Sequence, residues 1–231
     1  MLPSISKYKL YLYLFFLFFL SSIFNFRFLE NYQDMFSLKT ININGVSYKE
    51  KKNIEEELSK LKNINIFKIK EDKVLEKLNK FKFIESINVK KIIPSSININ
   101  LSKTSILGKT FINGEEFYIG KNGEFINQDQ IFEKYTIPTV FGEFELKEFL
   151  NLCDTLNNQM LEINKIEYYY YFKNRRWDLV FSNGLTLKLP SKNKRDSIKI
   201  YKKLLDNENL TNTKIIDLRV TDQIIMTNKN E

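Results

Sequence analysis

The side chains that most often carry out enzymatic chemistry are either absent from this sequence or lie among lysines. The chain has no histidine, which removes Ser-His-Asp and Cys-His catalysis and also the commonest zinc ligand. Acidic residues cluster at 55–57 and 115–116, but we interpret both clusters as solvated surfaces rather than acid/base pairs. The sequence also lacks a glycine-rich phosphate loop and a Cys-x-x-Cys pair. We therefore predict that the protein is not an enzyme and has no catalytic, metal or cofactor site.

The single cysteine, Cys153, cannot form an internal disulfide, so we expect hydrophobic cores to hold the chain together. It falls at an apolar position of a predicted helix, near Phe149, Leu150 and Leu156. A thiol in that setting packs as a small hydrophobe. We therefore predict a structural role for Cys153.

The net charge of +8 does not indicate a nucleic-acid interface. Such an interface requires a local basic patch, whereas lysines are spread through every segment of this chain. We expect instead a salt-dependent attraction to anionic headgroups or to acidic partners near a membrane. Neither nucleic acid nor a small-molecule substrate is a predicted ligand.

An uncharged apolar segment of seventeen residues, 10–26, lies between Lys9 and Arg27. As a helix it is about 26 Å long, which just spans a bilayer if the flanking cations reach the headgroups. A cleaved signal peptide is the competing interpretation, but no pair of small residues marks a cleavage site. We therefore predict one transmembrane helix at 10–26, a cytoplasmic tail at 1–9 and a linker at 27–37, with the rest exported.

Residues 38–106 carry the pattern of a compact α+β unit. Isoleucines alternate with asparagines over 38–46, which predicts a half-buried strand that turns at Gly45. Apolar residues recur at helical spacing within 50–63 and again within 72–83, with Asp72 as the predicted N-cap of the second helix. Strands at 84–93 and 96–106, broken at Pro94, complete a β-α-α-β-β order. We expect both helices on one face of a three-stranded sheet.

Residues 107–231 are predicted to form a mixed β-sheet with flanking helices. The expected elements, in chain order, are a hairpin with a type I′ turn at Lys121-Asn122-Gly123, a stop at 138–142, a helix at 146–157, a three-strand meander at 163–172, 177–181 and 185–189, a helix at 194–205, and strands at 214–219 and 223–227. The aromatic run at 168–172 is unusual, because it places rings on both faces of its strand. We expect core packing on one face and a partner or an adjacent loop on the other.

Several phrases carry a resemblance to known families. The order of elements in 38–106, with Ile41-x-Ile43-x-Gly45 and FIESINVKKIIP at 83–94, resembles a POTRA domain. The second half resembles the FtsQ/DivIB family of bacterial cell-division proteins in the phrases YIGKNGEF at 118–125, IPTVFG at 137–142, RWDL at 176–179, NGLTLKL at 183–189 and IDLR at 216–219. The resemblance implies a POTRA domain at 38–106 and an FtsQ-type β domain at 107–231.

The same resemblance implies a function in the division complex. Members of the family are non-catalytic scaffolds of the inner membrane at the septum, with most of the chain periplasmic, and they hold the partners FtsB and FtsL near their last strands. The implied partner-binding residues are Val220, Thr221 and Asp222, with Lys194 and Arg195 from the preceding helix. Our candidate edge strand for β-strand addition adds Gln223, Ile224, Ile225 and Met226, although three adjacent apolar residues also fit an ordinary core strand.

Arg219 has two possible roles, a structural pair with Asp217 or direct contact with a partner, and we favour the pair. Two other functions remain as alternatives. One is a POTRA-bearing transport or chaperone subunit that receives unfolded chains. The other is a membrane-anchored enzyme acting on the cell wall, which would need a converging acidic pair in a deep cleft.

Overall fold

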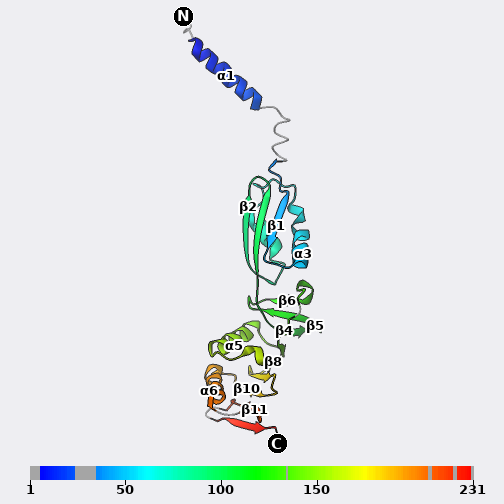
Figure 1. The fold of residues 1–231 in the computed structure, drawn as a ribbon, viewed down its shortest axis with the longest axis vertical. Coiled ribbons are helices and arrows are strands. Elements are labelled where there is room, and N and C mark those ends of the chain that lie inside the picture. The colour runs from blue at the N-terminus through cyan, green and yellow to red at the C-terminus, as the bar shows by residue number, and fades with distance from the viewer. Residues whose placement is uncertain (1–5, 24–34, 134, 208–209, 221–222, 230–231) are drawn as a thin grey trace. The chain divides into compact units, whose positions relative to one another are not determined.

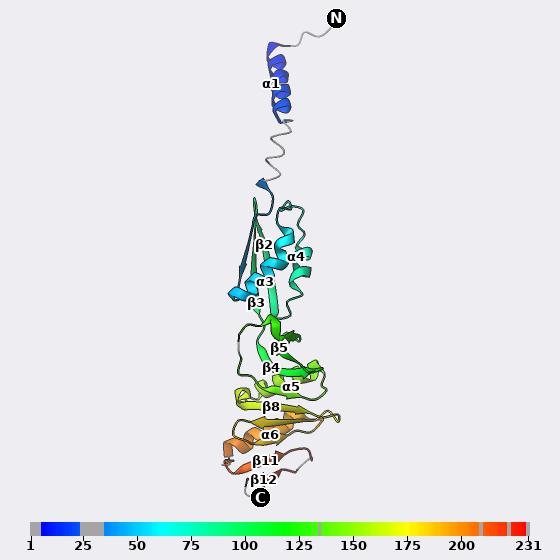
Figure 2. The ribbon, with the colours of Figure 1, turned by 90° about the vertical axis from the view of Figure 1, so that its right-hand side faces the viewer.

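The structure is a computed structural model that describes residues 6–23, 35–133, 135–207, 210–220 and 223–229 (Figures 1 and 2). Beyond an N-terminal helix, the chain folds into two compact units. The first comprises residues up to 80 together with 86–102, and the second comprises 81–85 together with the residues from 103 onward.

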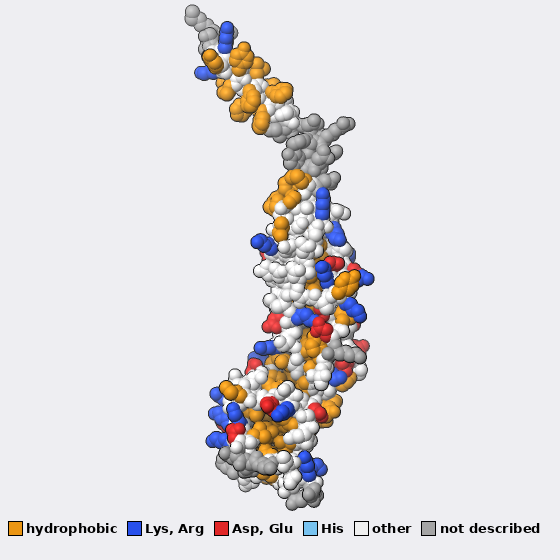
Figure 3. All heavy atoms as spheres, viewed as in Figure 1, with side chains coloured by type: hydrophobic (Ala, Val, Ile, Leu, Met, Phe, Trp, Pro, Cys, Tyr) orange, Lys and Arg blue, Asp and Glu red, His pale blue; other side chains and the backbone are white. Residues whose placement is uncertain are grey.

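Helix α1 (Lys7–Ile23) covers most of the predicted transmembrane segment, of which residues 24–26 lie outside the described ranges. Its residues from Leu10 to Leu20 are uncharged and each is about half exposed or more, so apolar side chains surround the helix (Figure 3). No helix within the described ranges is both long enough and apolar enough to cross a membrane.

The first unit has the β-α-α-β-β order that the sequence predicts. Its elements are β1 (Thr40–Asn44), α3 (Tyr48–Leu58), the 3-10 turn η1 (Ser59–Leu61), α4 (Glu71–Leu78), β2 (Ile84–Ile92) and β3 (Ser96–Lys103). The strand order is β1-β3-β2, with β1 parallel to the central strand β3. Figure 2 shows α3 and α4 together beside this sheet, as expected.

Alternating side chains build the core of the first unit. Ile97, Ile99 and Leu101 of β3 are buried, while the asparagines between them lie on the other face and pair with asparagines of β1. The helices contribute a stripe of buried residues consisting of Ile54, Leu58, Val74 and Leu78. The predicted N-cap was wrong, because α4 begins at Glu71 and Asp72 lies inside its first turn. That position still places a negative charge at the positive end of the helix.

The second unit contains a nine-stranded sheet. Its elements are β4 (Ile106–Ile112), β5 (Glu115–Gly120), β6 (Phe125–Asn127), η2 (Gln128–Gln130), β7 (Thr139–Phe141), α5 (Leu146–Asn158), η3 (Ile163–Lys165), β8 (Ile166–Tyr171), β9 (Trp177–Phe181), β10 (Thr186–Lys188), α6 (Lys194–Asn207), β11 (Thr213–Asp217) and β12 (Ile225–Asn228). The strand order is β12-β11-β10-β9-β8-β7-β4-β5-β6. The predicted meander β8-β9-β10 is confirmed as an antiparallel series.

Helices α5 and α6 lie on the same side of the strands of this sheet (Figure 1). Phe149, Leu152 and Leu156 of α5 pack in one core cluster with Trp177 and Leu179 of β9. Cys153 belongs to the same cluster and is only 3% exposed, so the predicted packing of the thiol is confirmed. Burial raises the pKa of this thiol to about 12, because the charged thiolate loses its hydration there.

Two strands of the second unit were missed from the sequence. The segment predicted as a stop contains β7, a three-residue strand that pairs in parallel with both β4 and β8. The second missed strand is β4. The strand predicted at 96–106 ends at Lys103 in the first sheet, and β4 of the nine-stranded sheet begins at Ile106. A short parallel strand such as β7 is stabilised by its neighbours rather than by a local alternating pattern.

The type I′ turn lies at a different Asn-Gly pair from the one predicted. Asn113 and Gly114 both have positive φ, and they join β4 to β5 as a two-residue hairpin loop. At Asn122-Gly123 only the glycine has positive φ, and Gly123 N donates to Gly120 O at 3.1 Å. This second hairpin is therefore a type I turn followed by a left-handed residue, the geometry of a G1 bulge.

The aromatic run in β8 divides between two faces, as expected. Tyr169 is fully buried against Phe149 of α5, and Tyr171 packs against Trp177 at 4.8 Å between ring centroids. Tyr168 and Tyr170 lie on the other face, where each is 38% exposed and contacts Phe141 of β7. The core prediction holds for one half of the run and leaves an exposed aromatic cluster on the other.

Replacing Tyr169 by phenylalanine is expected to stabilise the protein by about 1 kcal/mol. The Tyr169 hydroxyl is buried and has no hydrogen-bond partner among the described residues, so its removal ends an uncompensated desolvation cost. Urea denaturation followed by tryptophan fluorescence measures the change. Tyr171→Phe is the matched control and is expected to destabilise the protein, because the Tyr171 hydroxyl donates a hydrogen bond to Glu148 Oε2 at 2.5 Å. Destabilisation by Tyr169→Phe would contradict the prediction.

Candidate functional site

The candidate site is the end of the nine-stranded sheet formed by β12. This strand pairs with β11 through Ile216↔Met226 and Asp217↔Ile225, and it is the last strand in the sheet order. Within the described part of the chain, the outer edge of β12 therefore carries backbone groups that no neighbouring strand of its sheet satisfies. The predicted strand at 223–227 is shifted by two residues at its start, since β12 begins at Ile225.

Exposed apolar side chains gather at this edge. The exposed fractions are 48% for Val220, 46% for Ile224, 48% for Ile225 and 36% for Met226. Gln223 is also exposed and precedes the strand. The other two predicted residues of this segment, Thr221 and Asp222, lie outside the described residues. These exposed fractions contradict the alternative that Ile224–Met226 form an ordinary core strand.

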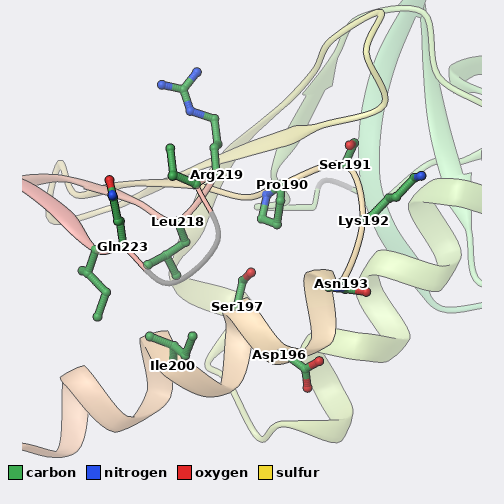
Figure 4. A pocket seen from close by; sticks show the side chains of 12 residues that line it. Pro190, Ser191, Lys192, Asn193, Asp196, Ser197, Ile200, Leu218, Arg219 and Gln223 are labelled. Atoms are coloured by element: carbon green, nitrogen blue, oxygen red, sulfur yellow. The ribbon is translucent and has the colours of Figure 1, made fainter.

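A hollow of about 640 Å³ lies beside the edge strand, between the start of α6 and the segment that follows β11. Asp196, Ser197 and Ile200 of α6 form one wall, and Leu218 reaches toward them from the end of β11 (Figure 4). Val220, Gln223 and Ile224 contribute the side nearest to β12. The hollow combines apolar side chains with hydroxyl, amide, carboxyl and cationic groups, the last from Lys192 and Arg219, so it has the composition of a docking site for a side chain.

Asp217 and Arg219 form a clamp at the end of β11. The Arg219 Nε donates to both carboxylate oxygens of Asp217, at 2.8 and 2.9 Å, and Nη2 makes a further short contact. The backbone N–H of Arg219 also donates to the same carboxylate, at 3.0 Å. These hydrogen bonds hold the pKa of Asp217 below its ordinary value and raise the pKa of Arg219. The predicted structural pairing of Arg219 is thus confirmed, and Figure 4 shows its side chain pointing away from α6.

Asp217→Asn is expected to lower the free energy of unfolding at pH 7 by on the order of 1 kcal/mol, a modest value because Arg219 is partly solvated. The folded-state pKa of Asp217 lies below the unfolded value of about 3.9. The contribution of the clamp is therefore present above that value and is lost as the pH falls through the folded-state pKa.

Urea denaturation of wild type and Asp217→Asn between pH 7 and pH 2 measures this contribution, and we expect the two curves to converge in acid. Asp154→Asn is the control, since Asp154 is exposed, and it should change stability by less than about 0.5 kcal/mol throughout. A difference between wild type and Asp217→Asn that stays constant with pH would contradict the assignment.

The two predicted cations of α6 do not line the hollow. Lys194 donates from Nζ to Ser191 O at 2.6 Å, and burial lowers its pKa. Arg195 is exposed at the start of the helix. The α6 residues that do face the hollow, Asp196, Ser197 and Ile200, were missed. Ile200 was the available signal, because it is an apolar residue outside the stripe of Ile198 and Tyr201 that enters the core.

The carboxylates singled out in the sequence form surface ion pairs. Glu57 Oε1 lies 3.1 Å from Lys77 Nζ and 2.9 Å from Lys80 Nζ, and these lysines hold the pKa of Glu57 below its ordinary value. Glu116 pairs with Lys109 at 3.1 Å. Both carboxylates are half-buried and paired with lysines, so the interpretation of these clusters as fully solvated faces does not hold for these two residues.

A second hollow, of about 470 Å³, lies among the end of α5, the β9–β10 turn and α6. The carboxylates of Glu162 and Asp206 line it. The carboxylate of Glu162 is exposed and forms an ion pair with Lys165. No group of three or more His, Cys, Asp or Glu side chains within the described residues is arranged to hold a metal ion.

Comparison with known proteins defines the class. The model of the FtsQ-type POTRA domain matches residues 36–103, which hold the first unit's sheet and helices. The model described as cell division protein FtsQ/DivIB, C-terminal, matches residues 111–219, which run from β4 to the clamp after β11. The chain is thus a POTRA unit followed by the C-terminal domain of a division protein.

The chain belongs to the FtsQ/DivIB family of cell-division proteins. It is 28% identical to the cell division protein FtsQ of Rickettsia bellii over 187 residues, which is 80% of this chain and 69% of that protein. It is also 28% identical to the FtsQ of Rickettsia typhi over 187 residues (80% and 70%) and 23% identical to that of Rhizobium radiobacter over 154 residues (66% and 73%).

Among solved structures, the chain is similar to the major extracytoplasmic domain of the trans isomer of DivIB from Geobacillus stearothermophilus. The TM-score is 0.32 and the sequence identity 13%, over 47% of this chain and 99% of that one.

Proposed function

We propose that this division protein is a non-catalytic scaffold that holds a partner chain by β-strand addition to the outer edge of β12. The observation that carries the proposal is the end position of β12 in its sheet, with four exposed apolar residues around it. FtsB-like and FtsL-like proteins of the division complex are the proposed partners, from the resemblance of this chain to its family.

The chemistry of β12 favours this edge over that of β2 in the first unit. Natural edge strands are commonly protected from unwanted pairing by charged side chains. β2 ends its sheet and carries Glu85, Lys90 and Lys91. β12 contains Ile225, Met226, Thr227 and Asn228 and thus has no charge that would repel an added strand.

Backbone pairing alone gives little affinity at an edge this short. Each hydrogen bond contributes only about 0.5–1.5 kcal/mol net, and β12 has four residues. An apolar side chain buried by the partner adds about 1.5–3 kcal/mol. The hollow next to the edge provides such a place, because Ile200, Val220 and Ile224 lie around it. Strand addition and occupation of this hollow together support specific binding.

We further propose that residues 10–26 anchor the chain in the inner membrane, with residues 1–9 in the cytoplasm and both folded units in the periplasm at the division septum. The support is the composition of α1, whose apolar side chains are exposed around the helix in the absence of lipid. An uncharged helix of this kind is stable when hydrocarbon surrounds it. The proposed location puts β12 on the same side of the membrane as the proposed partners.

The double variant Ile225→Glu/Met226→Glu tests the docking edge. Co-purification of co-expressed FtsB-like and FtsL-like partners with the full chain is expected to fall at least about tenfold, because charged side chains on an edge strand oppose the pairing of an added strand. Met160→Glu is the matched control, since Met160 is apolar and 83% exposed in the same unit but far from β12 in the sequence. Its co-purification should equal that of wild type.

A chain ending after Val220 provides a second variant, because it keeps the Asp217–Arg219 clamp and removes β12. Native Trp177 fluorescence verifies that the rest of the unit is folded. Undiminished partner binding by both variants would contradict the proposal.

A further inference from the structure

The chain that enters the first unit is joined to the loop between α3 and α4 by backbone hydrogen bonds. Leu38 N donates to Ile64 O at 2.9 Å, Asn63 N to Leu38 O at 3.0 Å and Ile66 N to Phe36 O at 2.8 Å. An antiparallel bridge between Ser37 and Asn65 completes the junction. The loop therefore lies where the polypeptide from α1 enters this unit.

This junction exposes an apolar surface. Phe67 is 60% exposed, Met35 41% and Ile64 39%, and the Phe36 ring lies 5.4 Å from that of Phe67. We call Met35, Phe36, Ile64 and Phe67 the apolar tip. Hydrophobic side chains gather at this end of the unit, next to Lys or Arg side chains (Figure 3).

The loop holds its apolar tip outward. Ile66 and Ile69, on either side of Phe67 in the sequence, are buried at 0% and 2%. The Asn65 side chain accepts a hydrogen bond from Phe67 N at 3.0 Å, which fixes the turn between the two buried residues. Ile66 and Ile69 occupy the buried positions of the loop, so Phe67 lies on its exposed side. Only contact with a partner outside this unit would remove water from the exposed Phe67 ring.

Four lysines flank the apolar tip in the sequence. Lys60, Lys62, Lys68 and Lys70 are all exposed, and residues 59–70 contain no acidic side chain. Exposed aromatic and aliphatic side chains with lysines close to them in the sequence match the chemistry of an anionic bilayer, with a hydrocarbon boundary beneath negative headgroups. Each such lysine contributes about 1 kcal/mol near an anionic surface, an amount that salt reduces.

The length of the connection places a bilayer within reach of the tip. Eleven residues, 24–34, separate the end of α1 from Met35. A fully extended connection of that length spans at most about 40 Å. If α1 lies in the membrane, the tip stays close enough to the lipid surface for its effective concentration there to be high.

We propose that the apolar tip inserts into the headgroup boundary of the anionic membrane that holds α1, while Lys60, Lys62, Lys68 and Lys70 contact the lipid phosphates. The inference rests on the membrane anchor proposed above and adds a second, peripheral attachment. This attachment keeps one end of the POTRA unit on the bilayer surface. It thereby reduces the distance that the unit can move from the membrane on the connection formed by residues 24–34.

The test uses the full chain in nanodiscs with Phe67→Trp, an exchange of one large aromatic residue for another. The native Trp177 is 1% exposed in the other unit and gives a constant background. Tyr48→Trp is the matched control, because Tyr48 is 83% exposed at the opposite end of α3 from the loop. Brominated lipids, which quench tryptophan at short range, are included in discs of phosphatidylglycerol and phosphatidylcholine.

We expect the fluorescence of Phe67→Trp to be quenched at least about twofold more strongly than that of Tyr48→Trp in anionic discs, and this excess to fall in pure phosphatidylcholine or in 1 M salt. The variant in which all four lysines are replaced by glutamine should lose the dependence on anionic lipid while retaining its circular dichroism. Equal quenching of the two variants would overturn the inference. Shielding of the indole at position 67 from solvent that depends on protein concentration and not on lipid would also overturn the inference. The tip would then bind a second copy of the chain or another protein.

Retention of the chain in the discs after a carbonate wash separates this inference from the function on which it rests. Failure of retention contradicts the membrane anchor and, with it, the proposal for the tip. Retention without quenching at position 67 leaves the anchor intact and overturns the tip alone.

Discussion

Gly45→Ala is expected to destabilise the first unit by more than about 3 kcal/mol. Gly45 has φ +91°, and a Cβ built at this position lies 1.8 Å from the carbonyl oxygen of Leu101. The neighbouring atom belongs to the backbone of the central strand β3, so relief of the clash requires β1 to separate from β3. The mutation therefore combines the strain of a left-handed alanine with the loss of strand pairing.

Urea denaturation followed by far-UV circular dichroism measures the effect of Gly45→Ala. The single tryptophan lies in the second unit, so its fluorescence transition should remain near that of wild type. Gly114→Ala is the control, because Gly114 has φ +86° but no atom within 4 Å of the added Cβ. It should cost about 1–2 kcal/mol, from backbone strain alone. Equal losses in the two variants would contradict the role of the Leu101 contact.

Trp177→Ala is expected to cost about 3–5 kcal/mol and to unfold the second unit at moderate temperature. Trp177 is 1% exposed, and its ring lies 4.8 Å from Tyr171, 5.8 Å from Phe144 and 5.9 Å from Phe149, measured between centroids. These contacts join the sheet to α5, so removal of the indole leaves a cavity between two layers of the unit.

Thermal unfolding followed by far-UV circular dichroism measures the loss, since the mutation removes the fluorescent residue. Tyr170→Ala is the matched control, because it removes an aromatic ring from the exposed face of the adjacent strand β8. That change should cost less than about 1.5 kcal/mol. A loss for Trp177→Ala no greater than the control would show that the aromatic cluster is not central to the core.

The first unit was predictable because its sequence pattern is local. Ile97, Ile99 and Leu101 alternate with polar residues, and Ile54 and Leu58 repeat at helical spacing, so the periods of strand and helix are visible within single segments. β7 has only three residues and follows Pro138, and its parallel neighbours are distant in sequence. A strand that depends on such partners leaves no periodic signal of its own.

The place of the last strand in its sheet was predictable, whereas partner binding there stays a prediction. The final strand of the chain, with three adjacent apolar residues, was the candidate edge, and β12 occupies the end of its sheet. The face of α6 that borders the hollow depends on the rotation of the helix, which packing of Ile198 and Tyr201 determines. The resemblance to the family implied Lys194 and Arg195, whereas Asp196, Ser197 and Ile200 line the hollow.

The order of strands in the first sheet determines when that sheet can form during synthesis. β3 is the central strand, and its Asn98 pairs with Asn42 of β1 across 56 positions of the chain. No part of the sheet can therefore assemble until β3 has emerged, and until then the apolar faces of α3 and α4 have no sheet to cover them. Long-range pairing of this kind slows folding and exposes intermediates to proteases and aggregation. The unit consequently assembles late, and its apolar helix faces are most accessible to a chaperone before β3 has been made.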